Sequence, residues 1–366
     1  MTRDTGVLRD QSVIILSSDD WGSGLKTSKY HIARTLAAHN RVLFVNSIGL
    51  RAPEASGSDA RRIGRKLASF LRGPVRAPEG LHVYSPVIVP FRRGAAPIRS
   101  VNGVLLRSAL RCLQLQLGLD NPYVFVFLPS FADAIEGLNA RAVCYYCIDD
   151  LAGYEGVDKE WFDGQESRLL SRSDCVICSS EKLLRDRFDG RHTNSHYVPH
   201  GVHWKLFRSA VERPLPLPED MREIPEPRLG FYGFLSDEWV DYELLNRMAR
   251  ERPDWHIVLI GKGRAGMDLD SYVAEPNIHC LGLKPFESLP AYTRHFAVGL
   301  VPFVKNELTA GCNPLKMLEY LSGGLPVVST DIPEVRKLGS LVNIADTHGE
   351  FVRACESQME EDGPAT

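Results

Sequence analysis

Short apolar segments alternate with segments of helical spacing along most of this chain. Residues 12–16 (SVIIL), 41–45 (RVLFV) and 123–128 (YVFVFL) are continuous apolar runs, and residues 28–39 carry apolar side chains at helical spacing. Apolar runs without polar alternation are typical of parallel strands that helices cover on both faces. The pattern predicts an α/β fold built from doubly wound sheets.

A proline-rich stretch interrupts this alternation. Residues 212–228 (ERPLPLPEDMREIPEPR) hold five prolines, which disfavour a helix or a central strand. We expect a Rossmann-like domain over residues 1–205, a linker over 206–227, a second Rossmann-like domain over 228–345, and a C-terminal helix or tail over 346–366. Ligands of such sheets bind beyond the C-terminal ends of the strands. We therefore expect a site in a central cleft between the two domains.

Charge and hydropathy exclude several classes of protein. The 366 residues contain 43 Lys and Arg against 46 Asp and Glu, a net charge of −3. This balance argues against a nucleic-acid partner, which favours a basic excess, and against an acidic disordered chain. No apolar run approaches the ~20 residues of a membrane span. The residues after Met1 lack the apolar segment of a secretory signal, and we expect a cytoplasmic protein.

Four of the eight cysteines form two CxxC pairs, at residues 144 and 147 and at residues 175 and 178. This spacing is compatible with structural zinc. However, both pairs lie in β-branched and aromatic runs that predict buried strands at residues 142–148 and 175–178. Positions i and i+3 of a strand face opposite sides, and neither pair contains a turn residue. We expect these cysteines to pack in the core, with zinc as the alternative.

The segment from residue 306 to 326 (NELTAGCNPLKMLEYLSGGLP) predicts a short helix with an anion site. Asn313 and Pro314 are typical of an N-cap and a first helical position, and Gly323 is typical of a helix end. Lys316 in the first turn opposes the helix dipole unless an anion binds there. Glu319 lies on the same helical face. The pair suits a nucleoside diphosphate, and an ordinary surface ion pair is the alternative.

These residues resemble the donor-site signature of GT-B retaining glycosyltransferases, the GT4 or "glycosyl transferases group 1" family. That family carries Glu, seven residues, Glu, and then Gly-x-Pro-Val-Val. Residues 197–207 (YVPHGVHWKLF), 229–233 (LGFYG), 258–263 (VLIGKG) and 277–282 (NIHCLG) are similar to further family segments, in the family's order. The matching signature residues are Glu319, Gly324, Pro326, Val327 and Val328.

The resemblance implies a GT-B fold and transfer of a sugar from a UDP, GDP or TDP sugar to a hydroxyl, with retention. It implies no metal and no cofactor besides the donor. Lys316 and the helix N-terminus would stabilise the leaving diphosphate, and Glu319 would bind the ribose. The implied donor-binding set is Gly233, Phe234, Gly261, Lys262, Asn313, Pro314, Leu315, Lys316 and Glu319.

The sequence departs from the family at two places. Gly311 occupies the position of the first Glu, and Glu307 is our candidate to bind the sugar instead, as a second catalytic residue beside Lys316. Phe234 stands where the family has an Arg that contacts phosphate, with Lys262 or Arg264 as further phosphate partners. An inactive partner of another transferase and a sugar-nucleotide epimerase remain alternative functions.

In the N-terminal half the resemblance covers the strand–helix pattern and the first loop, residues 17–27. Asp20, Gly22, Ser23 and Gly24 of this loop would face the diphosphate. The acidic pairs at 19–20 and 149–150 leave a metal-bound diphosphate as an alternative. The candidate acceptor residues are Asp149, Asp150 and His200.

Residues 61–72 (RRIGRKLASFLR) are basic and amphipathic, from Arg61 to Arg72. A helix of this kind suits a peripheral contact with an anionic membrane, which would bring the protein to a lipid-linked acceptor. A solvated helix that packs on its own domain is the alternative. The acceptor would be a growing surface polysaccharide or a small secondary metabolite, and the transfer O- or S-linked.

Overall fold

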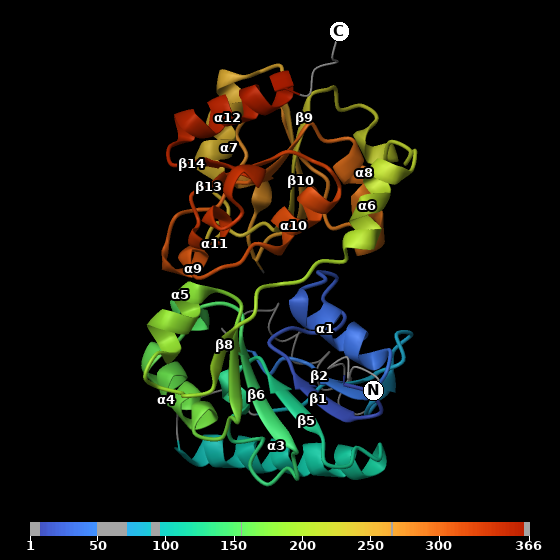
Figure 1. Ribbon diagram of the computed structural model, residues 1–366, viewed down its shortest axis with the longest axis vertical. Coiled ribbons are helices and arrows are strands. Elements are labelled where there is room, and N and C mark those ends of the chain that lie inside the picture. Colours follow the sequence, from blue (N-terminus) through green and yellow to red (C-terminus); the bar gives the residue numbers. More distant parts are fainter. Residues whose placement is uncertain (1–7, 50–71, 89–95, 155, 265, 362–366) are drawn as a thin grey trace, which may run out of the picture. The chain divides into compact units, whose positions relative to one another are not determined.

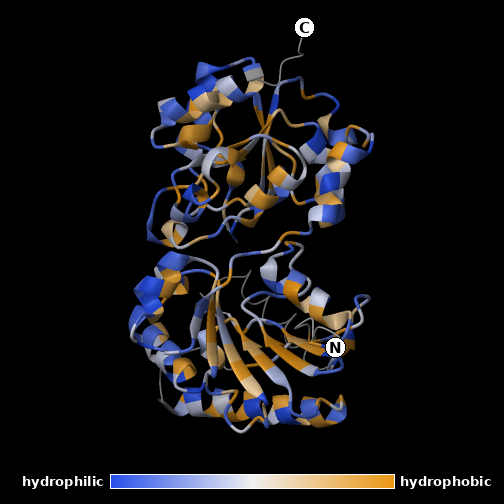
Figure 2. Ribbon diagram, viewed as in Figure 1, coloured by the Kyte–Doolittle hydropathy of each residue, from blue (hydrophilic) through white to orange (hydrophobic). Residues whose placement is uncertain are grey.

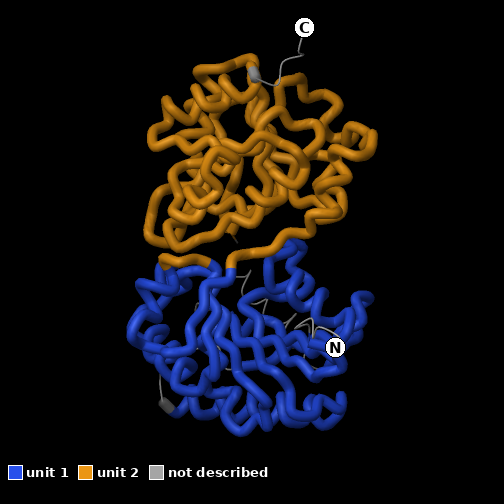
Figure 3. Tube along the Cα trace, viewed as in Figure 1, with its two compact units in different colours: residues 1–179, 183–198 blue, residues 180–182, 199–366 orange. Residues whose placement is uncertain are grey.

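The computed structural model describes residues 8–49, 72–88, 96–154, 156–264 and 266–361 (Figure 1). The chain divides into two compact units (Figure 3). The first unit comprises residues 1–179 and 183–198, and the second comprises residues 180–182 and 199–366. The amphipathic segment at residues 61–72 lies outside the described residues, except for Arg72.

The first unit contains an eight-stranded sheet in the order β3-β4-β2-β1-β5-β6-β7-β8. All of its strand pairs are parallel except β3 with β4. The strands are β1 (Ser12–Leu16), β2 (Arg41–Val45), β3 (Val75–Arg76), β4 (His82–Tyr84), β5 (Tyr123–Val126), β6 (Ala142–Cys147), β7 (Cys175–Cys178) and β8 (Ser195–Tyr197). The helices are α1 (Ser28–Ala37), α3 (Ala96–Gln116) and α4 (Lys159–Leu170). The short helix α5 (Glu181–Leu183) is divided, with Glu181 and Lys182 in the second unit and Leu183 in the first.

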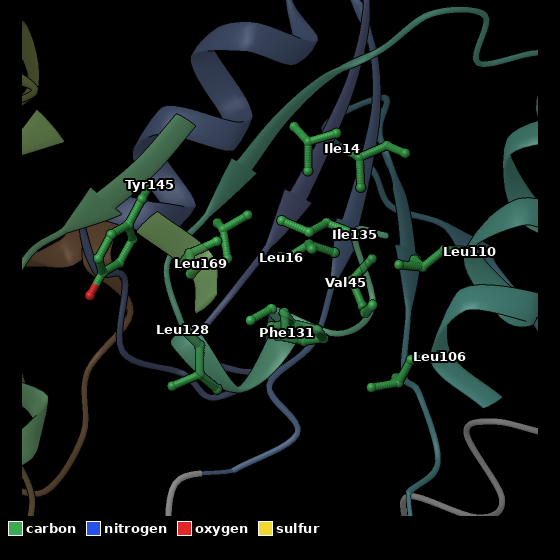
Figure 4. Close-up of a cluster of buried hydrophobic side chains, with 14 of the residues drawn as sticks. Ile14, Leu16, Val45, Leu106, Leu110, Leu128, Phe131, Ile135, Tyr145 and Leu169 are labelled. Atoms are coloured by element: carbon green, nitrogen blue, oxygen red, sulfur yellow. The ribbon is translucent and has the colours of Figure 1, made fainter. Parts of the chain in front are cut away.

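Alternate residues of a strand point to opposite faces of its sheet. In the first sheet, helices cover both faces. Ile14 and Leu16 of β1 pack with Leu106 and Leu110 of α3 in one buried cluster (Figure 4). Val13 and Ile15 pack instead with Ala33 of α1. The central strands β1, β2 and β5 are therefore largely apolar (Figure 2), as buried parallel strands require.

The second unit contains a six-stranded parallel sheet in the order β11-β10-β9-β12-β13-β14. Its strands are β9 (Arg228–Phe234), β10 (His256–Lys262), β11 (Ile278–Cys280), β12 (Val298–Val301), β13 (Val327–Thr330) and β14 (Asn343–Ala345). Its helices are α6 (Trp204–Glu212), α7 (Tyr242–Glu251), α8 (Leu289–Arg294), α9 (Glu307–Ala310), α10 (Leu315–Ser322), α11 (Pro333–Arg336) and α12 (His348–Glu361).

The segment at residues 206–227, which we expected to be a linker, is part of the second unit and begins with a helix. Residues 206–227 belong to the second unit, and α6 packs against α8 and α10. Phe207 and Ala210, three residues apart on α6, are both buried, so this helix has a core-facing side. The five prolines follow α6, where the chain is irregular apart from one short turn at Glu219–Met221.

The cysteine pairs are only partly as expected. Cys147 and Cys178 are buried, but Cys144 and Cys175 are only half-buried, and all eight cysteines are free. Within the described ranges, no three His, Cys, Asp or Glu side chains converge to hold a metal ion. None of the helices in the same ranges is both long and apolar enough to cross a bilayer.

Candidate functional site

The strands β9 and β10 end in a close approach of their backbones. Gly233 and Gly261 are register partners with φ angles of 149° and 152°, a region that side chains disfavour. A Cβ on Gly261 would lie 1.9 Å from the carbonyl oxygen of Gly233. A Cβ on Gly233 would lie 2.9 Å from Cε of Lys316. Gly261 is therefore required by its φ and by the approach of the Gly233 carbonyl oxygen, and Gly233 is required by its φ.

Helix α10 is fixed in rotation by Tyr320. A Cβ on Gly299 of β12 would lie 2.7 Å from the Tyr320 ring, so the ring occupies the space that a side chain there would fill. The Tyr320 hydroxyl accepts a hydrogen bond from the backbone N–H of Tyr232 at 3.1 Å. Because Lys316 and Glu319 belong to the same helix, Tyr320 also sets the direction of their side chains.

The Lys316 ammonium lies against two buried aromatic rings. Nζ is 4.9 Å from the ring centroid of Phe231, on β9, and 4.6 Å from that of Phe303, which follows β12. An ammonium over an aromatic face is stabilised by the ring quadrupole. A backbone bridge between Val240 and Phe303 connects the loop after β9 to the loop after β12. The charge of Lys316 is thus held at the C-terminal ends of two neighbouring strands.

Glu319 is a buried carboxyl group, with only 5% of the residue exposed. Burial raises its pKa to about 7, although the nearby Lys316 charge and the Tyr232 side chain both lower it. A carboxyl group with this pKa is present in both protonation states near neutral pH. It can therefore accept hydrogen bonds from ligand hydroxyl groups and can also donate one.

The N-terminus of α10 begins one residue later than the sequence predicts. Pro314, rather than Asn313, is the N-cap, and no side chain caps the helix. Asn313 and Pro314 are buried and Leu315 is half-buried. The first N–H groups of any α-helix lack intrahelical partners and carry a partial positive charge. This end of α10 therefore presents the field that an anionic ligand requires, and Lys316 adds a full charge to it.

The other residues expected to contact the phosphates differ from Lys316 in their exposure and in their ion pairs. Lys262 is exposed at the end of β10, and Phe234 is half-buried beside it in register. The guanidinium of Arg264 donates to both carboxylate oxygens of Asp237, at 3.0 and 3.4 Å. Arg264 is thus already neutralised in part, and Lys316 is the better placed cation.

Glu307 begins helix α9, which Asn306 and Thr309 close with reciprocal side-chain caps. Its side chain is 85% exposed and pairs with Lys182 of the same unit at 3.1 Å. Gly311, at the position of the family's first Glu, is the C-cap of α9. No contact in the described residues connects Glu307 directly to Lys316 or Glu319.

The loop after β1 in the first unit is organised around Asp19. Its carboxylate accepts a hydrogen bond from Thr27 at 2.7 Å and pairs with Lys29 at 3.0 Å. Burial works against the charge of Lys29, but Asp19 and Asp149 together raise its pKa. Asp149 therefore belongs to the electrostatic surroundings of this loop, at the C-terminal end of the first sheet.

The predicted residues of this loop have distinct roles. The backbone N–H of Ser23 donates to the Asp20 carbonyl oxygen at 3.0 Å and closes a turn. Gly24 has a φ of 84°, which favours glycine. Gly22 is exposed, and a Cβ there would meet nothing within 4 Å. Only Gly24 is thus explained by backbone conformation.

Asp150 takes part in a buried ion network that the sequence does not predict. Arg187 donates to Asp150 at 2.9 Å, to Asp163 at 3.0 Å and to Glu166 at 2.8 Å. Glu166 is completely buried and also accepts a hydrogen bond from Tyr145 at 2.9 Å. The Asp150 carboxylate is therefore held by the Arg187 guanidinium, as part of the structure of the first unit. The third acceptor candidate, His200, is half-buried between β8 and α6 and belongs to the second unit.

Residues 226–361 match the family model described as glycosyl transferases group 1. The second unit is a group 1 glycosyl transferase domain. The whole chain is similar to the putative teichuronic acid biosynthesis glycosyltransferase TuaH of Bacillus subtilis, at 22% identity over 96% of this chain and 90% of that protein.

Two solved structures show that the group 1 domain and the first unit together form a GT-B fold. One is sucrose-phosphate synthase of Thermosynechococcus elongatus, with 14% identity, a TM-score of 0.67, and coverage of 96% of this chain and 90% of the other. The other is HepE of Anabaena in complex with UDP-glucose, with 12% identity, a TM-score of 0.64 and the same coverage, 96% and 90%. At these identities the likeness concerns the fold alone.

Proposed function

We propose that this chain transfers a sugar from a nucleoside-diphosphate sugar to an acceptor hydroxyl with retention of configuration. The observation that carries the proposal is the placement of Lys316 and Glu319 on one buried helix at the C-terminal ends of β9 and β12. Open parallel sheets bind ligands at that end. The similarity to HepE, which was solved with UDP-glucose, supports a nucleotide sugar as the donor.

In this proposal Lys316 and the N-terminus of α10 stabilise the charge that develops on the leaving diphosphate. Preorganised charges of this kind are the largest contribution to many transfer reactions. Glu319 binds the ribose hydroxyls, and the exposed Glu307 reaches the donor sugar from α9. No metal takes part, so a chelator such as EDTA leaves the rate unchanged.

The acceptor in this proposal is a growing surface polysaccharide, which the first unit binds through Asp149, because Asp150 is already paired with Arg187. The name of the similar B. subtilis protein, a putative teichuronic acid biosynthesis glycosyltransferase, supports this class of acceptor. A small secondary metabolite with an oxygen or sulphur nucleophile is the alternative acceptor.

A thermal-shift panel with UDP, GDP, TDP, ADP and CMP tests the donor site. A ligand at 100 times its Kd adds about 2.7 kcal/mol of stability, which is a shift of several degrees for a protein of this size. One nucleotide should stabilise the wild type and fail to stabilise Glu319→Ala. Glu212→Ala, an exposed substitution on α6, is the matched control and should respond like the wild type. No shift with any nucleotide would contradict the donor site.

Transfer itself is tested with the sugar nucleotides of the base that binds. NMR of the product gives the anomeric configuration, and an inverted linkage would refute retention. The replacement of the family's Glu by Gly311 and of its Arg by Phe234 favours one second candidate, an inactive partner subunit. Such a protein would bind nucleotide and turn over no donor with any acceptor. An epimerase would convert the donor without an acceptor.

A further inference from the structure

Two cysteine thiols from neighbouring strands meet on one face of the first sheet. Cys144 of β6 and Cys175 of β7 are register partners, and their Sγ atoms are 3.5 Å apart. Both residues are half-buried. Parallel strands lie about 4.8 Å apart, within the range of Cα separations that a disulfide spans.

A second pair three residues further along provides an internal comparison. Cys147 and Cys178 are also register partners, but they point to the opposite face and lie in the apolar core of the unit. Burial raises the pKa of Cys147 well above its usual value and that of Cys178 to about 12. The same two strands thus carry one buried thiol pair and one half-buried pair.

The surroundings of Cys175 favour its thiolate. The S–H···S contact with Cys144 lowers the pKa of Cys175 to about 7, against the effect of burial, and the nearby His192 lowers it further while Asp174 raises it. The same contact is the main cause that raises the pKa of Cys144. The pair therefore consists of one nucleophilic sulphur and one protonated neighbour, the arrangement found in reactive dithiols.

We propose that Cys144 and Cys175 are a redox modification site, a dithiol that hydroperoxides convert reversibly into a cross-strand disulfide. With hydrogen peroxide, the Cys175 thiolate attacks one oxygen, the O–O bond breaks, and hydroxide leaves and is protonated to water. The Cys144 sulphur then attacks the resulting sulfenic acid and gives up its proton. Its S–S bond replaces the S–O bond, and a second water leaves. Two thiols are oxidised and one peroxide is reduced.

The two sulphurs are close enough to form the bond with a small movement, and thiol–disulfide exchange with an added dithiol reverses it. The sulphurs must approach by about 1.5 Å to reach the ~2.05 Å of a disulfide. Since β6 and β7 are already paired, oxidation leaves the fold intact and adds a link across the segment that contains α4.

The test uses the reduced full-length chain with hydrogen peroxide at pH 7.5, followed by denaturation and labelling with N-ethylmaleimide. The unoxidised chain should take eight labels, one for each cysteine, and the oxidised chain two fewer. Trypsin should then release residues 142–159 joined to residues 173–182, and dithiothreitol should restore all labels. This measurement needs no variant. Full labelling after peroxide, or overoxidation without a cross-link, would overturn the proposal.

Variants assign the bond within those two peptides, each of which holds two cysteines. Cys144→Ser and Cys175→Ser should each abolish the cross-link, whereas Cys178→Ala and Cys112→Ser should keep it. Circular dichroism checks that each variant is folded. Iodoacetamide labelling of Cys175 should have a midpoint near pH 7, against about 8.5 for an ordinary thiol. A cross-link that survives Cys175→Ser and disappears in Cys178→Ala would place the site in the core pair instead.

Discussion

The Lys316 ammonium lies 4.6 Å from the centroid of the Phe303 ring and 4.9 Å from that of Phe231. These rings come from segments that are distant in sequence, and together they hold the Lys316 charge of α10 at the strand ends. In the proposed reaction this charge lies beside the diphosphate. Its surroundings should therefore affect nucleotide binding as well as stability.

Replacing Phe303 with Leu should weaken nucleotide binding. The substitution keeps an apolar side chain but removes the ring that stabilises Lys316, an interaction of about 0.5–2 kcal/mol. We expect the Kd for the preferred nucleotide to rise by about 2- to 30-fold in isothermal titration calorimetry. Phe351→Leu, a buried ring on α12 of the same unit, is the control for lost aromatic volume. An equal loss of affinity in both variants would contradict the role of Phe303.

Gly233→Ala should disturb both the backbone and Lys316. The residue has a φ of 149°, and the added Cβ would meet Cε of Lys316 at 2.9 Å. Conformations of this kind cost about 1–3 kcal/mol for other residues. We expect a lower midpoint in urea unfolding together with weaker nucleotide binding.

Gly164→Ala is the matched glycine control. Gly164 lies inside α4, and a Cβ there would meet nothing within 4 Å. Alanine should raise stability by about 0.5–1 kcal/mol because it favours the helix. Stabilisation by both substitutions would show that Gly233 is not constrained.

Glu319 should make stability depend on pH. Its pKa rises from 4.5 in an ordinary carboxyl group to about 7 in the folded chain, so between these values the folded state binds more protons than the unfolded state. Stability should therefore fall as the pH rises from 4.5 to 7 and change no further above 7, by an amount on the order of 3 kcal/mol. Urea unfolding at pH 5 and pH 8 measures this change.

Glu319→Gln should remove that part of the pH dependence. The variant should be more stable than the wild type at pH 8, and the difference should shrink towards pH 5. The exposed substitution Glu212→Gln serves as the control and should follow the wild type at both values. If Glu319→Gln keeps the wild-type dependence, another group is responsible.

Arg187→Met should destabilise the first unit by about 3–5 kcal/mol because it removes the less exposed of the two cations that pair with a buried carboxylate and leaves only Arg191. Glu166 is fully buried and accepts hydrogen bonds from Arg187 at 2.8 and 3.3 Å. Thermal unfolding measures the loss. The double variant Arg187→Met/Glu166→Gln should recover much of it, and Arg185→Met, at an exposed arginine two residues away, should change little. A double variant no more stable than the single one would refute the ion network.

The parallel strands could be predicted from the sequence because their signal is local. Residues 12–16, 41–45 and 175–178 are strands with the predicted bounds, since burial on both faces requires a continuous apolar run. The family resemblance and the GT-B fold are confirmed by the comparisons. Helix α6 was not predicted, because the prolines that follow it indicated a linker. Phe207 and Ala210 nevertheless have helical spacing.

The contacts within the site join residues that are far apart in the sequence. No local pattern of residues therefore predicts them. Nothing near Phe303 in the sequence indicates that it contacts Lys316, because the contact depends on how the loop after β12 is held by Val240. The same holds for Arg187, whose acidic partners come from α4 and from the loop after β6. The roles of Glu307, Asp149 and His200 stay predictions.

The Tyr320 ring in the space above Gly299 has a consequence for how a donor would bind. Since the sheet already holds α10 in one rotation, the ligand does not have to order this helix. Binding then loses less conformational entropy, which is how rigid sites gain affinity. A bulkier residue at position 299 would change none of the residues expected to bind the donor. It would nevertheless rotate α10 and turn Lys316 and Glu319 away from the ligand.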